Sequence, residues 1–220
     1  MANNYYDATG VLVLDQVTPV ITALFGGLKL DASYPGNGEV YIAQIAEDSG
    51  AHWDDVCEDL VALAQSLGLS VPSEGPPTMD DVLAVLSRHF GTDQDEDLQH
   101  LIEHHRFEDD SDLDALFLIA TRLDDGHGLK EIRFEGCWYC SKPRLFNVGG
   151  DGSFISREFS VFGASGQVLD LGNRIRQALL IQNLEAAANL FARETQRLLA
   201  GITDETQRRQ LQHRLSELLS

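Results

Sequence analysis

The stretch LKEIRFEGCWYCSKPRLFNVGGDGSFISREFSVF, residues 129–162, decides the fold. Three of its segments, LKEIRFEGCWYC, PRLFNV and SFISREFSVF, have the β-branched and aromatic content that is typical of strands. The glycine-rich GGDG, residues 149–152, favours a tight hairpin turn between the second and third segments. We therefore expect a three-stranded antiparallel β-meander over about residues 129–163.

Helical patterns stand on both sides of this stretch. Before it, Thr18 and Pro19 suit the start of a helix that runs to Phe25, and residues 39–46 are typical of a strand. An apolar stripe predicts another helix over residues 53–67, Thr78 is placed to cap the next, and two shorter amphipathic pieces follow. After it, residues 167–200 are helical with a break near residues 182–183, and a last helix follows Thr203 or Asp204. The apolar positions of the long segment are expected to face inward: Leu171, Ile175, Leu179, Leu184, Ala188, Phe191 and Leu198.

This order of elements predicts an α+β fold, with an acidic, mostly helical N-terminal part, the meander and C-terminal helices. The expected division is residues 1–128 and residues 129–220, although a single continuous domain also fits. Hydrophobic content of 43% and charged content of 23% are ordinary for a globular protein. No apolar run approaches the roughly 20 residues of a membrane span, and the first residues do not resemble a secretory signal. Three cysteines, an odd number, fit a reducing cytoplasm, which is the predicted location.

The charge is distributed unevenly. Residues 1–128 hold 25 acidic and four basic residues, whereas residues 129–220 hold ten acidic and twelve basic ones. The acidic half either keeps the protein soluble or offers a face to a basic partner, and it does not favour direct nucleic-acid binding, because phosphate repels it. The partner-binding candidates are the aspartates of two short segments: Asp93, Asp95, Asp97, Asp109, Asp110, Asp112 and Asp114.

The basic residues around the predicted hairpin are candidates for an anion site. GGDG lacks the spacing and the strand–loop–helix setting of a phosphate loop. An anion would therefore be bound by basic side chains and by the backbone N–H groups at the start of the following helix. The alternative is an internal salt-bridge surface that docks on the acidic half. The candidate residues are Lys142, Arg144, Arg157, Arg174 and Arg176.

Two motifs superficially match metal sites. HLIEH places His100 and His104 four apart beside Glu103, as in an inverted zinc-protease helix, but only the distant Glu185 is a conceivable third ligand. CWYC, with Cys137 and Cys140, falls in a predicted strand, where residues three apart point to opposite faces. We therefore expect neither a metal nor another cofactor, and the turn at residues 124–127, DDGH, is expected to be structural.

A resemblance covers most of the chain. CSKPRLFNVGGDGSFISREFSVF, with the preceding LDALFLIATRLDDGHGL and the early VLVLDQVTPVITALFG, resembles uncharacterised accessory proteins of bacterial integrative and conjugative elements. The resemblance implies a bacterial cytoplasm and a role in element maintenance or host interaction, and it transfers no catalytic residue.

The function favoured by the sequence is that of a non-enzymatic interaction or regulatory protein. Its acidic lobe would bind a basic protein, in the sharpest version by mimicking the phosphates of DNA. The alternative is a metal-dependent hydrolase or a phosphate-ligand enzyme that uses the His- and Asp-rich residues 100–127 or the basic hairpin. No Ser-His-Asp or Cys-His set can be assigned from the sequence, and the oligomeric state is not predicted.

Overall fold

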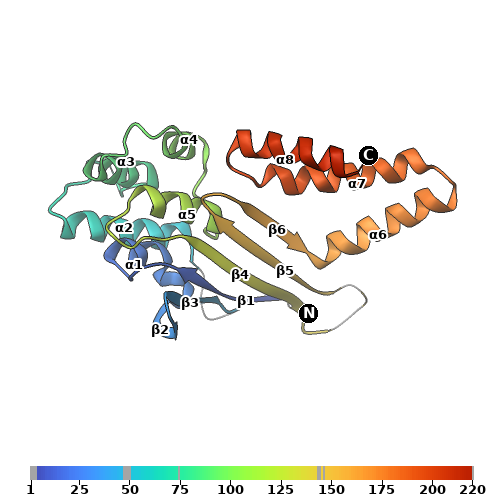
Figure 1. Cartoon of the computed structure of the whole chain (residues 1–220). Helices are drawn as coiled ribbons and strands as arrows, with labels where there is room; N and C mark the ends of the chain where they lie inside the picture. The colour runs from blue at the N-terminus through green and yellow to red at the C-terminus, as the bar shows by residue number, and fades with distance from the viewer. Residues whose placement is uncertain (1–3, 47–50, 74, 143–144, 146, 220) are drawn as a thin grey trace. The chain divides into compact units, whose positions relative to one another are not determined.

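The structure is a computed structural model that describes residues 4–46, 51–73, 75–142, 145 and 147–219. The described residues form an α+β fold, as predicted (Figure 1). The chain divides into two compact units, Tyr6–Arg133 and Met1–Tyr5 together with Phe134–Ser220. We call them the first and the second unit.

The sheet differs from the predicted meander, because it has six strands in the order β2-β3-β1-β4-β5-β6. β1 pairs with β3, β2 with β3, and β5 with β6, in each case antiparallel. The strand predicted at residues 39–46 is β3, but strand pairing between distant segments leaves no local signal in the sequence. The strands are β1 (Asn4–Val13), β2 (Asp31–Gly36), β3 (Glu39–Gln44), β4 (Glu131–Cys140), β5 (Val148–Ser156) and β6 (Ser160–Ala164).

GGDG is not a turn, and that prediction was wrong. The four residues lie inside β5, where Asp151 pairs with Ala164 and Gly152 with Gly163 of β6. None of these glycines has a positive φ. A side chain at Gly149 would collide with the indole of Trp138 in β4, so this glycine serves close packing instead of a turn.

The hairpin turn lies at residues 156–159. The hydroxyl of Ser156 accepts hydrogen bonds from the backbone N–H groups of Glu158 (3.2 Å) and Phe159 (3.1 Å), and Ser156 N donates to Phe159 O at 2.9 Å. A serine hydroxyl that binds the backbone two and three residues on can close a turn without glycine. Of the predicted strand PRLFNV, Pro143, Arg144 and Phe146 lie outside the described residues, Leu145 is in a turn, and β5 begins only at Val148.

The first unit contains most of the apolar core. Thr18 caps its first helix by accepting from Ile21 N, and Thr78 caps α3, as predicted. On α3 the cap is a capping box, in which the Asp81 side chain also accepts from the backbone of Thr78. Of its described apolar residues, 32 are buried, among them Trp53, Leu60 and Leu86. Its helices, grouped in Figure 1 from blue to green, are α1 (Pro19–Phe25), α2 (Trp53–Ser66), α3 (Met79–Phe90), α4 (Glu96–His104) and α5 (Leu113–Arg122), with a 3₁₀ turn η1 (Gly26–Leu28) after α1.

The second unit has little core of its own. Besides its strands it contains α6 (Ser165–Leu180), α7 (Leu184–Ala200) and α8 (Glu205–Leu218), and the predicted break near residue 182 separates α6 from α7. Among its described apolar residues, five are buried: Phe134, Cys140, Ile155, Ala178 and Ala187. The prediction that Leu179, Leu184, Phe191 and Leu198 face inward was wrong, because each is exposed by 44–70%.

Candidate functional site

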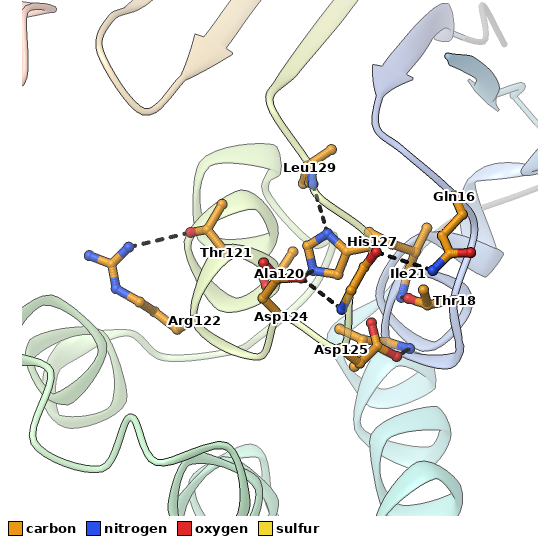
Figure 2. Close-up of polar contacts among 12 residues, drawn as sticks. Gln16, Thr18, Ile21, Ala120, Thr121, Arg122, Asp124, Asp125, His127 and Leu129 are labelled. Carbon is orange, nitrogen blue, oxygen red and sulfur yellow. Dashed lines mark hydrogen bonds and ion pairs between the residues drawn. The ribbon is translucent and has the colours of Figure 1, made fainter. Parts of the chain in front are cut away.

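The DDGH turn after α5 makes several hydrogen bonds to other parts of the first unit (Figure 2). The His127 side chain is fully buried, and its Nδ1 accepts a hydrogen bond of 2.8 Å from the backbone N–H of Leu129. Because Nδ1 is an acceptor, the ring proton lies on Nε2, which donates to the carbonyl of Ala120 at 3.0 Å. Both ring nitrogens are therefore engaged by backbone groups, and neither has a lone pair to offer a metal.

The same turn fastens the segment between β1 and α1. The backbone N–H of Asp15 donates to His127 O at 2.8 Å, and Gln16 Nε2 donates to Gly126 O at 3.2 Å. Asp125 Oδ2 accepts from Val20 N at 3.2 Å, near the start of α1, while Asp125 Oδ1 is buried with no hydrogen-bond partner among the described residues. The turn thus links the end of β1, the start of α1 and the end of α5 by hydrogen bonds, which agrees with the structural role expected for it.

The polar residues of HLIEH, His100, Glu103 and His104, lie exposed on α4. The rings of His100 and His104 stack with their centroids 4.2 Å apart, and His104 Nδ1 lies 3.0 Å from His100 O. Glu185, the conceivable third ligand, lies in α7 of the second unit. Within the part of the chain that the structure describes, no three His, Cys, Asp or Glu side chains gather as a metal ion requires.

The cysteines of CWYC occupy opposite faces of β4. Cys137 is exposed and Cys140 is buried, as the alternation of side chains along a strand predicts. Cys57, the third cysteine, is buried on α2. This arrangement fits a packing role for Cys140 and Cys57.

The first acidic segment, residues 93–97, is organised by Arg122 of α5. The guanidinium binds Asp95 through Nε at 2.7 Å and Asp97 through Nη2 at 2.9 Å. Asp95 also caps α4, because its Oδ1 accepts from Leu98 N at 3.0 Å. Partial burial raises the pKa of Asp95, but the hydrogen bonds from Arg122 and from the backbone outweigh that effect and leave the pKa below its ordinary value. Asp95 is therefore first a structural residue of α4 and α5.

The second acidic segment, residues 108–114, is bound to the start of α2. Asp109 O accepts from Trp53 N at 3.0 Å, and Asp110 lies 3.0 Å from His52 Nδ1. Asp112 caps α5 through Ala115 N at 2.8 Å and also contacts His105 Nε2 at 2.9 Å. Burial and then the charge of Asp112 raise the pKa of Asp114. Most of the aspartates predicted to bind a partner thus have bonds within the fold.

A third group of acids lies on α2 and α3. Burial raises the pKa of the Cys57 thiol, and the negative charges of Asp54, Asp81 and Glu58 raise it further. Burial and a neighbouring carboxylate likewise raise the pKa of Asp59, beside Asp55, and of Asp80, beside Asp81. Carboxylates of like charge are therefore crowded at the start of two adjacent helices.

The predicted anion-site residues are only partly placed. Arg144 lies outside the described residues, Lys142 is exposed after β4, and Arg157 is exposed in the β5–β6 turn. Arg174 and Arg176 lie in the second half of α6 and not at its start, so the N-terminal backbone donors of that helix do not add to them. Arg174 contacts Asp170 at 3.4 Å.

Two depressions lie between helices. One, of about 550 Å³, lies between α1 and α2 and has Asp59 as its charged residue. The other, of about 470 Å³, lies between α6 and α7 and is lined by Arg174 and Arg193, with Asn173, Gln177 and Asn189 beside an apolar floor. The second depression would suit an anionic group better than the β5–β6 turn does.

Sequence reasoning missed the roles of His52, His105 and Arg122. Each binds an aspartate more than six residues away along the chain, and the sequence shows only separate histidines and acids. The one local signal is the N-cap position of Asp95 and Asp112, three residues before an apolar helical position. That signal favours capping over partner binding.

No family model, no curated protein and no solved structure matches this chain. Within the described residues, no helix combines the length and the apolarity that crossing a membrane requires.

Proposed function

We propose that this protein is a non-enzymatic interaction protein whose acidic first unit binds a basic protein surface. The observation that carries the proposal is the charge of that unit: residues 6–133 hold 26 acidic and six basic residues, a net charge of −20. Three of the basic residues are already occupied, since Arg122 binds Asp95 and Asp97, Lys130 binds Asp15, and Arg133 binds Glu39 and Glu131. A basic partner would supply the positive charge that the unit lacks.

The exposed acids of α2 are better binding candidates than the aspartates of residues 93–114. Asp95, Asp110 and Asp112 bind within the fold, so a partner would have to compete with those bonds. Asp54, Asp55, Glu58 and Asp59 are all exposed and lie within two turns of one helix. Burial and the charge of Asp55 raise the pKa of Asp59, so a nearby cation would relieve unfavourable electrostatic energy.

The finer versions of this function are part of the same proposal. The crowded carboxylates of α2 could take the place of DNA phosphates on a basic protein, which supports the version in which the chain mimics DNA. The resemblance to accessory proteins of mobile elements supports a partner that itself binds nucleic acid. The alternative of a metal-dependent hydrolase receives no support, because no third metal ligand lies beside His100 and His104 among the described residues.

The test is capture from a bacterial lysate on the tagged full chain, with elution by increasing salt. The variant Asp54→Asn, Asp55→Asn, Glu58→Gln, Asp59→Asn should lose the captured basic protein at lower salt than the wild type. The matched control neutralises four exposed acids of the C-terminal helices: Asp170→Asn, Glu185→Gln, Glu205→Gln and Glu217→Gln. Duplex DNA added as a competitor should displace the chain from its partner if the chain mimics DNA.

The proposal fails if nothing binds in a salt-sensitive way, or if the two variants weaken capture equally. In the second case the effect would come from net charge alone and not from a surface on α2. Displacement by DNA bears only on the mimicry version.

A further inference from the structure

The depression between α6 and α7 lies entirely within the second unit. The two helices pack against each other and are joined by residues 181–183, where Asn183 N donates to Ala178 O at 2.9 Å (Figure 1). Ile181, in this turn, and Ala186, just after it, are among the residues that line the depression. Its walls therefore come from two helices that a short, hydrogen-bonded connection holds together.

The charged residues that line the depression all have the same sign. Arg174 of α6 and Arg193 of α7 line it, and no acid is among its described lining residues. The acids of these two helices, Asp170, Glu185 and Glu194, lie outside it. Two guanidinium groups at one depression repel each other unless an anion lies between them. The local charge therefore favours an anionic ligand.

Both arginines are available to such a ligand. Arg193 is exposed and has no hydrogen bond or ion pair with another described residue. Arg174 contacts Asp170 at 3.4 Å, and exposed ion pairs of this kind contribute little. A phosphate group can replace Asp170, because its oxygens accept two parallel hydrogen bonds from a guanidinium. Arg197, by contrast, is already bound to Glu194 and to a backbone carbonyl of β6.

The net charge of the chain does not exclude an anion from this depression. The charge of −19 comes from the first unit, whereas α6 and α7 together hold four arginines and three acids. At physiological ionic strength, exposed charges farther apart than about 8 Å are largely screened from each other. The affinity for a small anion therefore depends mainly on the residues that line the depression.

The other lining residues suit an organic group attached to the anion. Asn173, Gln177 and Asn189 carry amides, which have both donors and acceptors, as the polar edge of a nucleobase does. The apolar part of the lining includes Leu190 and the buried Ala178. The volume of about 470 Å³ falls within the range of roughly 300–1,000 Å³ that is typical of small-molecule sites. The depression therefore has room for more than a phosphate group.

We propose that the depression between α6 and α7 binds a phosphate monoester of nucleotide size. Arg174 and Arg193 bind the phosphate oxygens, and the amides of Asn173, Gln177 and Asn189 bind the attached group. The site is separate from the partner surface on α2 and does not depend on it.

The test titrates the full chain with inorganic phosphate, with ribonucleoside 5′-monophosphates and with the corresponding nucleosides, followed by two-dimensional NMR. Phosphate should bind in the millimolar range, and at least one monophosphate should bind at least ~10-fold more tightly. The nucleoside of that monophosphate should bind at least ~10-fold more weakly than the monophosphate, because it lacks the charged hydrogen bonds. The signals that shift should include the side-chain amides of Asn173, Gln177 and Asn189.

Arginine variants locate the site. Arg174→Gln and Arg193→Gln should each raise the dissociation constant of the monophosphate at least ~10-fold, because a charged hydrogen bond is lost. Arg176→Gln is the matched control, since it removes the same charge from α6 but is not among the lining residues, and it should change the constant less than about 3-fold. All three arginines are exposed, so the variants should keep the fold, which circular dichroism checks.

Four results would overturn the proposal. The first is that neither phosphate nor any monophosphate shifts a signal at concentrations up to about 20 mM. The second is that Arg176→Gln weakens binding as much as the other two variants, because the effect then comes from net charge alone. The third is that the nucleosides bind as tightly as their monophosphates, and the fourth is that phosphate binds but no monophosphate binds more tightly. None of these results bears on capture by α2, because the variants leave that helix unchanged.

Discussion

At the scale of single residues, the acids of the first unit divide into structural and surface ones. Asp95 and Asp97 bind the same guanidinium, but the Asp95 side chain is 27% exposed and that of Asp97 is 73% exposed. An ion pair in solvent contributes little, whereas a partly buried carboxylate with several donors contributes more. Equal charges in one short segment therefore have unequal effects on stability.

This difference can be measured by chemical denaturation at neutral pH. Asp95→Ala removes a helix cap and a charged hydrogen bond and should lower the free energy of unfolding by about 2–3 kcal/mol. Asp95→Asn keeps a capping oxygen and should lower it by less. Asp97→Ala is the control and should lower it by less than about 1 kcal/mol. Equal losses for Asp95→Ala and Asp97→Ala would contradict this assignment.

At the scale of elements, the junction of α7 and α8 depends on a glycine. A Cβ on Gly201 would overlap the carbonyl oxygen of Ser160, and both residues belong to backbone that is hydrogen-bonded across the junction. Arg197, one turn earlier on α7, donates to Phe162 O of β6 at 2.8 Å. The end of α7 is thus fixed to the hairpin by close backbone contact.

The Gly201→Ala change should therefore lower the free energy of unfolding of the second unit by about 1–3 kcal/mol, because the hairpin and the helix must move apart. In Gly172→Ala, on α6, the new methyl group has no neighbour within 4 Å. That variant should be more stable by about 0.5–1 kcal/mol, because alanine favours the helix. Thermal unfolding followed by circular dichroism distinguishes the two, and a stabilised Gly201→Ala protein would show that the contact is not tight.

At the scale of the whole molecule, the crowded carboxylates affect stability as a function of pH. Burial and adjacent acids raise the pKa values of Asp59, Asp80 and Asp114 above their ordinary value of 3.8. The folded chain then binds protons at a higher pH than the unfolded chain does, so stability rises as the pH falls through these raised values. The lowered pKa of Asp95 acts in the opposite direction, but only below pH 3.8.

We therefore expect the melting temperature at low salt to rise as the pH is lowered toward the raised pKa values of these carboxyls. Added salt at pH 7 should also raise it, by screening the charge of the first unit. Asp114→Asn should reduce the pH dependence, because one carboxyl with a raised pKa is removed. A melting temperature that does not rise as the pH approaches these pKa values, or a rise that Asp114→Asn leaves unchanged, would contradict this expectation.

The sequence by itself determined the local features. It predicted the α+β class, the caps at Thr18 and Thr78, the helical stripe of α2 and the break before α7, because capping and apolar periodicity are interactions between neighbours in the chain. The opposite faces of Cys137 and Cys140 also followed from strand geometry alone.

Only the tertiary structure decided the rest. Whether GGDG turns or stays in a strand depends on the Trp138 ring in the neighbouring strand, and whether Asp112 is free depends on His105. Leu184 and Phe191 have the periodicity of a buried face, but periodicity shows only that an apolar side exists and not what covers it. Long-range contacts decide these cases, since the free energy of a side chain depends on which distant residues surround it.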